Sequence, residues 1–245
     1  MMKDLQKIAP LFSGWNETLI WSVLQGHMGY AIADNEVAPE AAQVVLGDFC
    51  FLAGKPSVSF AAKAAAREIV PQNERWSDAI EQAFGSRAQR RLRYSILKEP
   101  EVFSREKLQG YLDALPSEYT LSLFDESIYH KSMHESWSRD FCACFEGADD
   151  FLTRGVGAAV LHNGVLVSGA SSYSVYDGGF EIEIDTKPEY RRKGLATICA
   201  AKLILTALER GLYPSWDAFD LRSVALAEKL GYHVDQPYII YILKD

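Results

Sequence analysis

The chain has 245 residues, 48% of them hydrophobic and 24% charged, and carries a formal net charge of −8. This composition is typical of a globular protein, and the length is sufficient for one large domain or two modest ones. The acidic balance argues against general nucleic-acid binding, because affinity for a duplex depends on neutralising many phosphates with Lys and Arg.

The N-terminal residues and the cysteines predict a cytoplasmic protein. "MMKDLQKIAPLF" has no apolar stretch behind a basic start, so we expect no signal peptide. The longest mostly apolar run, 41–54, is 14 residues long and contains Asp48, so we expect no membrane span. The four cysteines form neither a disulfide framework nor a CxxC pair, and we expect reduced thiols.

Residues 1–115 are predicted to form an α/β domain. Residues 15–29 and 73–85 have helical character, and residues 42–54 and 91–98 have strand character. The boundary is placed in "DALPSE", where loop composition is the only cue.

The second domain, 116–245, is predicted to begin with a strand and a helix. The strand lies within "LPSEYTLSLFD", and Asp125 is the expected N-cap of a helix over 126–141. Two β-prone runs, 157–162 and 165–175, are joined by Asn163-Gly164, the strongest short hairpin signal.

A further strand is predicted over 180–186, after the turn "YDGG". Its apolar residues alternate with acidic ones, so one face is apolar and the other carries carboxylates. These carboxylates belong to Glu181, Glu183 and Asp185.

The remaining elements are read from periodicity and stop signals. A helix is predicted from Leu195 to Arg210, ended by Gly211. A short strand over 214–219, a helix over 221–231 and a closing strand over 238–243 follow.

A basic turn precedes the helix that begins at Leu195. Arg191, Arg192 and Lys193 stand immediately before Gly194, where unpaired backbone N–H groups and the helix dipole favour an anion. The small side chains of Gly194 and Ala196 let phosphates approach the backbone. We therefore predict a pyrophosphate site at this turn.

Other nucleotide-binding motifs are excluded. The chain has no G-x-x-x-x-G-K-[ST], and "GVGAAV" at Gly155 lacks the third glycine and enters a hairpin instead of a helix. Gly155 and Gly157 are therefore interpreted as the start of a strand.

The hexapeptide Arg191–Ala196 resembles the acyl-CoA signature [QR]-x-x-G-x-[GA] of the GNAT N-acetyltransferase superfamily. "DLRSVALAEKLGY" is similar to a later segment of that family, and the resemblance covers roughly 116–245. It implies an α/β (α+β) acyl-CoA N-acyltransferase fold, with a mixed twisted sheet splayed between its fourth and fifth strands. The N-terminal domain would be an addition that shapes the acceptor pocket.

The resemblance also implies acetyl-CoA as co-substrate and no metal. The backbone of the strand end would pair with the pantetheine arm, the turn would hold the pyrophosphate, and two residues near the last helix would complete the site. The implied cofactor residues are Ile184, Asp185, Thr186, Arg191, Arg192, Lys193, Gly194, Leu195, Ala196, Thr197, Asp220 and Ser223. Asp220 stands where the family frequently has Asn, which is a departure from its pattern.

The general base implied by the resemblance is Glu183, with Glu181 as the alternative, because the family commonly carries a carboxylate on this strand. Which of them faces the acceptor depends on whether the strand carries a bulge. Many members also use a Tyr to protonate the departing thiolate, but that position is Ala227 here. Tyr232, Tyr173 or solvent would then act in its place.

Alternatives remain open for the function. The first is an acetyl-CoA-dependent N-acetyltransferase that acts on a primary amine in a ternary complex, without a covalent intermediate. The second is a non-catalytic module that senses acyl-CoA, which Ala227 favours; a hydrolase or a scaffold that merely keeps the fold is the third. The acceptor and the oligomeric state are not specified, with a homodimer among the options, and no nucleic-acid or membrane partner is expected.

Overall fold

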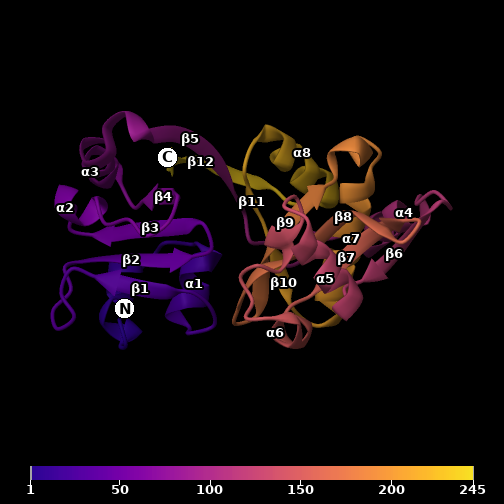
Figure 1. Cartoon of the computed structure of the whole chain (residues 1–245), viewed down its shortest axis with the longest axis horizontal. Helices are drawn as coiled ribbons and strands as arrows, with labels where there is room; N and C mark the ends of the chain where they lie inside the picture. The colour runs from indigo at the N-terminus through magenta and orange to yellow at the C-terminus, as the bar shows by residue number, and fades with distance from the viewer. Residues whose placement is uncertain (1, 245) are drawn as a thin grey trace. The chain divides into compact units, whose positions relative to one another are not determined.

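The computed structural model describes residues 2–244, which divide into two compact units (Figure 1). The second unit is continuous, Tyr94–Gln236, whereas the first consists of the residues up to Arg93 together with those from Pro237 onward. The sequence predicts one boundary, after residue 115. The units of the structure divide at 93/94 and again at 236/237, so the last strand returns to the first unit.

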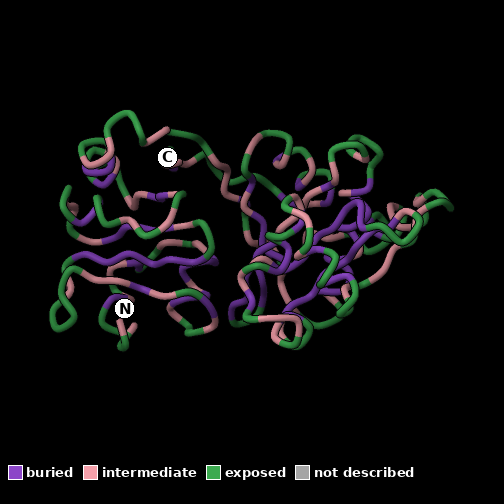
Figure 2. Tube along the Cα trace, in the orientation of Figure 1, coloured by how far each residue is buried: buried purple, intermediate pink, exposed green. Residues whose placement is uncertain are grey.

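The first unit is a mixed sheet with short helices. In sheet order its strands are β1 (Tyr30–Ala33), β2 (Ala41–Leu46), β3 (Phe49–Gly54), β4 (Glu68–Pro71), β12 (Val234–Leu243) and β5 (Ala88–Ile96), the last two of which continue into the second unit. Its helices are η1 (Leu5–Lys7), η2 (Ala9–Phe12), α1 (Thr18–Leu24), α2 (Val58–Ala61), α3 (Glu74–Phe84) and η3 (Gly85–Arg87). The buried residues of β2 and β3 form its centre (Figure 2).

The strand character predicted for residues 42–54 is confirmed, and the run contains two strands. The run folds as the antiparallel hairpin of β2 and β3, with Leu46 opposite Phe49 and Gly47 in the left-handed region at φ 55°. A two-residue turn of this kind fits inside an apolar run, because only the turn residues interrupt the pattern. The helices predicted nearby are present, α3 over nearly its expected range and α1 over a shorter one.

The second unit contains a five-stranded sheet between helical layers. Its strand order is β10 (Tyr213–Ser215), β9 (Gly179–Thr186), β8 (Val165–Tyr176), β7 (Gly157–His162) and β6 (Tyr119–Leu123). The helices are α4 (Arg105–Asp113), α5 (Glu126–His134), η4 (Arg139–Phe141), α6 (Ala148–Arg154), η5 (Pro188–Tyr190), α7 (Leu195–Glu209) and α8 (Leu221–Leu230). The two-residue strand β11 (Asp217–Ala218) pairs with Tyr94 and Ser95 of β5.

Two consecutive residues of β8, whose side chains point to opposite faces of the sheet, show which helix covers each face. Ser168 bonds the buried thiol of Cys199 on α7, so α7 covers one face. A side chain at Gly169 would collide with the ring of Phe141, so η4 covers the other face. None of the described helices is long and apolar enough to cross a membrane.

The cap and the turn predicted from local residues of this unit are confirmed. Asp125 caps α5 by accepting a 2.8 Å hydrogen bond from the Ile128 N–H, and the Asn163-Gly164 turn joins β7 to β8. The helix predicted over 126–141 is interrupted, however, because Glu135 is extended at φ −109° and ψ 140°. Its carboxylate accepts from Lys187 Nζ at 3.2 Å and from Trp137 Nε1 at 2.9 Å.

Two features of β9 position the candidate site. β10 runs parallel to β9 only as far as the pair Ser215 and Glu181, and the rest of β9 pairs with β8 alone among the described residues. On the β8 side the register shifts around Tyr173, which forms a β-bulge. The sheet is therefore open on one side of the second half of β9.

Candidate functional site

An open cleft of about 370 Å³ lies at this opening in the second unit. Its lining comes from the end of β9, η5, the turn before α7, the first turn of α7, and α8. The lining residues are Ile184, Asp185, Thr186, Tyr190, Arg191, Arg192, Gly194, Leu195, Ala196, Thr197 and Leu226. The structure thus brings together the predicted cofactor residues, with the exceptions of Lys193, Asp220 and Ser223.

The turn before α7 presents backbone to the cleft. Gly194, the N-cap of α7, has φ 80°, and Arg192 has φ 64°. Among the described non-glycine residues only Asn163 also has a positive φ. A Cβ placed on Gly194 would find no atom within 4 Å, so the backbone there is open. Because the first N–H groups of a helix have no intrahelical partner, the turn is an anion-binding surface.

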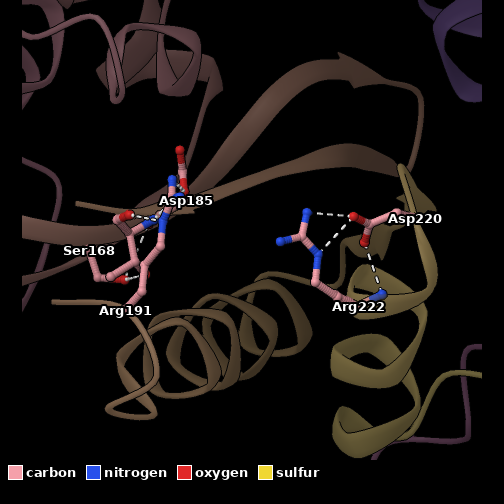
Figure 3. Close-up of polar contacts among 6 residues, drawn as sticks. Ser168, Asp185, Arg191, Asp220 and Arg222 are labelled. Atoms are coloured by element: carbon pink, nitrogen blue, oxygen red, sulfur yellow. Dashed lines mark hydrogen bonds and ion pairs between the residues drawn. The ribbon is translucent and has the colours of Figure 1, made fainter. Parts of the chain in front are cut away.

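Arg191 ties the turn to the end of β9 (Figure 3). Its Nε donates to the Thr186 carbonyl oxygen at 2.9 Å, and its Nη2 lies 3.2 Å from Asp185 Oδ1. Ser168 holds the same strand end from the other side, at 2.7 Å from Thr186 Oγ1. Arg192, by contrast, is exposed and makes no hydrogen bond or ion pair with the described part of the chain.

Lys193 lies beside the cleft without lining it. Its ammonium is 4.8 Å from the centre of the Tyr190 ring and 3.5 Å from the Tyr119 hydroxyl. Tyr190 was not predicted, although its place directly before the basic residues was a signal for it. Leu226 was also missed, and its position on the apolar face of the predicted helix could have indicated it.

Asp220 and Ser223 make their hydrogen bonds at the start of α8. Asp220 Oδ1 caps the helix by accepting from the N–H groups of Arg222 at 2.9 Å and Ser223 at 3.0 Å. The other carboxylate oxygen, Oδ2, lies 2.6 Å from Arg222 Nη2 (Figure 3). The hydrogen bond from the Arg222 side chain lowers the pKa of Asp220, and the two N–H groups add to this. Ser223 Oγ accepts from Trp216 Nε1 at 3.0 Å. An acidic residue at position 220 is therefore accommodated by its own helix.

The two candidate bases lie on one face of β9. Glu181 is 7% exposed and pairs across the sheet with Ser174 and Ser215. Glu183 is half-buried, stands opposite Ser171, and precedes Ile184 of the cleft lining. The bulge at Tyr173 falls on β8 between these pairs, so it leaves the alternation of β9 intact.

Tyrosines lie around Glu181, near the buried start of β9. Burial raises the pKa of Tyr213 to about 12 and that of Tyr232 well above its ordinary value, and the charge of Glu181 adds to both. The Tyr232 hydroxyl donates to the Pro214 carbonyl oxygen at 2.6 Å, and the residue is 1% exposed and outside the cleft lining. Ala227, at the position of the family tyrosine, is fully buried.

The buried cysteines of this unit are not activated. Burial raises the pKa of Cys142 and Cys199 to about 12, so both thiols are protonated at neutral pH. Among residues 2–244 no group of three or more His, Cys, Asp or Glu side chains is arranged to hold a metal ion. His130 lies 3.8 Å from Glu126.

Comparison with known proteins gives consistent matches. A family model described as GNAT acetyltransferase matches residues 9–241. The crystal structure of a GCN5-related N-acetyltransferase-like protein from Streptococcus suis 89/1591 is 42% identical, with a TM-score of 0.94 over 99% of both chains. A GCN5-related N-acetyltransferase from Kribbella flavida, 15% identical with a TM-score of 0.55 over 100% of this chain and 97% of its own, shows likeness of fold alone.

A relative is also found among curated proteins. The uncharacterized N-acetyltransferase YdfB of Bacillus subtilis (strain 168) is 34% identical over 131 residues, which are 52% of this chain and 49% of that protein. The match therefore spans about half of the length of this relative.

Proposed function

The chain belongs to the GNAT acetyltransferase family, and on this basis we propose that it transfers the acetyl group of acetyl-CoA to a primary amine. The observation that carries the proposal is the cleft beside β9, where an exposed strand edge and an open helix N-terminus meet. An extended chain with amides at one end and phosphates at the other fits such a cleft.

The residues present fit acetyl-CoA in two parts. Ile184, Asp185 and Thr186 line the opening beyond the last pair with β10, and the strand edge at Ile184 is offered to the amides of the pantetheine arm. The Thr186 backbone is already engaged, because its N–H donates to Asp185 Oδ1 and its carbonyl oxygen accepts from Arg191 Nε. The turn offers its N–H groups and the Arg192 guanidinium to the pyrophosphate. The open space at Gly194 lets the phosphates approach the backbone.

Glu183 is the base in the proposed mechanism, because it is the more accessible of the two carboxylates and adjoins the cleft lining. It takes a proton from the ammonium of the acceptor, directly or through water. The free amine nitrogen forms a bond to the thioester carbonyl carbon and then loses its second proton to solvent, and the C–S bond breaks with its electron pair left on sulfur. The C–N bond forms and the C–S bond breaks within one ternary complex, so the mechanism has no acyl-enzyme intermediate.

The thiolate takes its proton from solvent in this scheme. A thiol of ordinary pKa near 8.5 is a good leaving group near neutrality, so a dedicated acid at the position of Ala227 is not required. Tyr232 supports the sheet through its bond to Pro214, and its burial and raised pKa make it a poor proton donor to the cleft.

A second candidate is an acyl-CoA sensor that does not turn its ligand over. It is favoured by Ala227, which is buried and has no ionisable group. The two functions share the cleft and differ only in chemistry, so release of free thiol from acetyl-CoA with any amine excludes the sensor.

The test is calorimetric titration with acetyl-CoA. We expect the wild type to bind acetyl-CoA with a micromolar dissociation constant. Binding should be lost in Ala196→Trp, because the indole fills the cleft, and at least tenfold weaker in Arg192→Glu. Ala196 is preferred to Gly194 for the blocking variant, since a side chain at Gly194 would be strained at its φ of 80°. Arg75→Glu, an exposed charge reversal in the first unit, is the matched control.

Two results of this titration would contradict the proposal. If the wild type shows no heat with acetyl-CoA at millimolar concentration, the cofactor assignment falls. If Ala196→Trp binds as well as the wild type, the ligand lies elsewhere. An amine screen that reads free thiol then follows on the wild type.

A further inference from the structure

The cations around the turn do not have equal surroundings. Arg191 is engaged by Asp185 and by the Thr186 carbonyl, so its charge is largely offset within the protein. Arg192 lines the cleft and is exposed without a partner in the described chain. A pyrophosphate bound there would have Arg192, the helix dipole and the N–H groups as partners, which offset most of its negative charge. Lys193 is therefore not needed to bind the pyrophosphate.

Lys193 is held at the rim of the cleft by aromatic rings. Tyr190 lines the cleft and also carries the Lys193 ammonium over its ring, at 4.8 Å from the centre. Tyr119, at the start of β6, adds its hydroxyl at 3.5 Å. A cation over an aromatic face keeps its charge and its N–H groups available on the opposite side, where Lys193 is exposed.

His162 fixes this arrangement from the end of β7. Its Nδ1 lies 3.0 Å from the Tyr190 hydroxyl, with the donor set by the tautomer. Its ring lies 5.2 Å from the centre of the Tyr119 ring and 5.6 Å from that of Tyr190. Three rings from β6, β7 and η5 thus form a platform for one lysine: the Tyr190 ring carries the ammonium, and Tyr119 and His162 pack against Tyr190. A merely solvated lysine would not need this platform.

We propose that Lys193, positioned by Tyr119, His162 and Tyr190, binds the ribose 3′-phosphate of coenzyme A and makes the protein select CoA over its 3′-dephospho form. This inference rests on the proposed function, since it deepens the same site. A ribose phosphomonoester carries nearly two negative charges at neutral pH, so it is the strongest anion on the molecule outside the pyrophosphate. Lys193 adjoins the cleft through Tyr190 without being part of its lining, so it suits an anionic group of the ligand other than the pyrophosphate.

The experiment compares two ligands that differ only in the phosphate. CoA and 3′-dephospho-CoA are titrated calorimetrically into the wild type, Lys193→Met and Lys63→Met at about 0.1 M salt. Lys63 is an exposed lysine of the first unit, so its variant controls for the loss of one positive charge. We expect the wild type and Lys63→Met to prefer CoA by about tenfold, a typical value for one charge-assisted contact.

Lys193→Met is expected to reduce this preference to less than about twofold, by weakening CoA while leaving 3′-dephospho-CoA unchanged. The unchanged affinity for the dephospho ligand also shows that the variant is folded. The inference is overturned if the wild type binds both ligands equally, or if Lys193→Met weakens both by the same factor, which would assign Lys193 to the pyrophosphate. Binding of neither ligand to the wild type would instead overturn the proposed function, and this inference with it.

Discussion

Glu183 and Glu181 have the same chemistry and the same face of β9, but their surroundings differ. Glu181 is 7% exposed among tyrosines whose pKa it helps to raise, whereas Glu183 is half-buried beside the cleft. A carboxylate that receives a proton from a diffusing acceptor must be reachable, and this requirement separates the two.

The first prediction follows at this scale. Glu183→Gln should lower kcat for acetyl transfer about 100-fold, because loss of a general base costs at least that much, while the Kd for acetyl-CoA stays within about twofold. Steady-state rates with an amine found in the screen, together with titration of acetyl-CoA, measure both quantities. Glu181→Gln is the matched comparison, and a larger loss of kcat in Glu181→Gln than in Glu183→Gln would reverse the assignment.

Site residues could be predicted from the sequence where they lie in one continuous segment, and not where their contacts come from distant segments. The turn from Arg191 to Ala196 was recognised from six consecutive residues, and the structure places all of them but Lys193 in the cleft lining. Asp220 was assigned to cofactor binding from its place in a motif, but its carboxylate is used by its own helix. The platform under Lys193 could not be foreseen, since Tyr119, His162 and Tyr190 come from three separate elements.

At the scale of elements, α8 begins at a residue with two functions. Asp220 caps the helix through backbone N–H groups and also pairs with Arg222. Asparagine could provide the cap without the charge, so the two contributions are separable.

We predict that Asp220→Ala lowers the free energy of unfolding by about 1 kcal/mol and that Asp220→Asn lowers it by less. Because the folded-state pKa of Asp220 is lowered, its charge contributes stability above the unfolded pKa near 3.9, and that stability is lost as pH falls through the folded pKa. Urea unfolding at several pH values should therefore show the full difference between wild type and Asp220→Asn at pH 6 to 7 and a progressively smaller one as the pH falls below the unfolded pKa. A difference that is constant with pH would contradict the ion pair.

Elements were predicted well where local signals agreed and poorly where a distant partner decided. The Asn163-Gly164 hairpin and α7 needed only their own residues. The end of α5 at His134 was missed because nothing in the local sequence forbids a helix there, and the extended Glu135 is held by Lys187 from after β9. The hairpin of β2 and β3 was hidden by a continuous apolar run.

At the scale of the molecule, the first unit depends on the end of the chain. Tyr241 of β12 is fully buried in the core of this unit, pairs with Ile69 of β4, and donates its hydroxyl hydrogen to Glu81 at 2.6 Å. The closing strand was predicted from its pattern, but its return to the first unit was not, because strand pairing between distant segments leaves no local signature.

Tyr241→Ala should therefore destabilise the first unit, by about 3–5 kcal/mol for loss of a buried aromatic side chain. Hydrogen exchange read by mass spectrometry should show lost protection in β3 and β4 and retained protection in β7 and β8. Tyr241→Phe, which keeps the ring, should cost only about 1 kcal/mol. Equal loss of protection in both units would show that they do not open separately.

The discontinuity of the first unit also sets an order for synthesis on the ribosome. Residues 94–236, the whole of the second unit, are translated before the strand that closes the first unit exists. At roughly 5–20 residues per second this interval lasts on the order of 10–30 s. The nascent first unit waits through it with β4 uncovered along the edge that β12 later takes, so the second unit can be complete while the first unit still needs protection from aggregation.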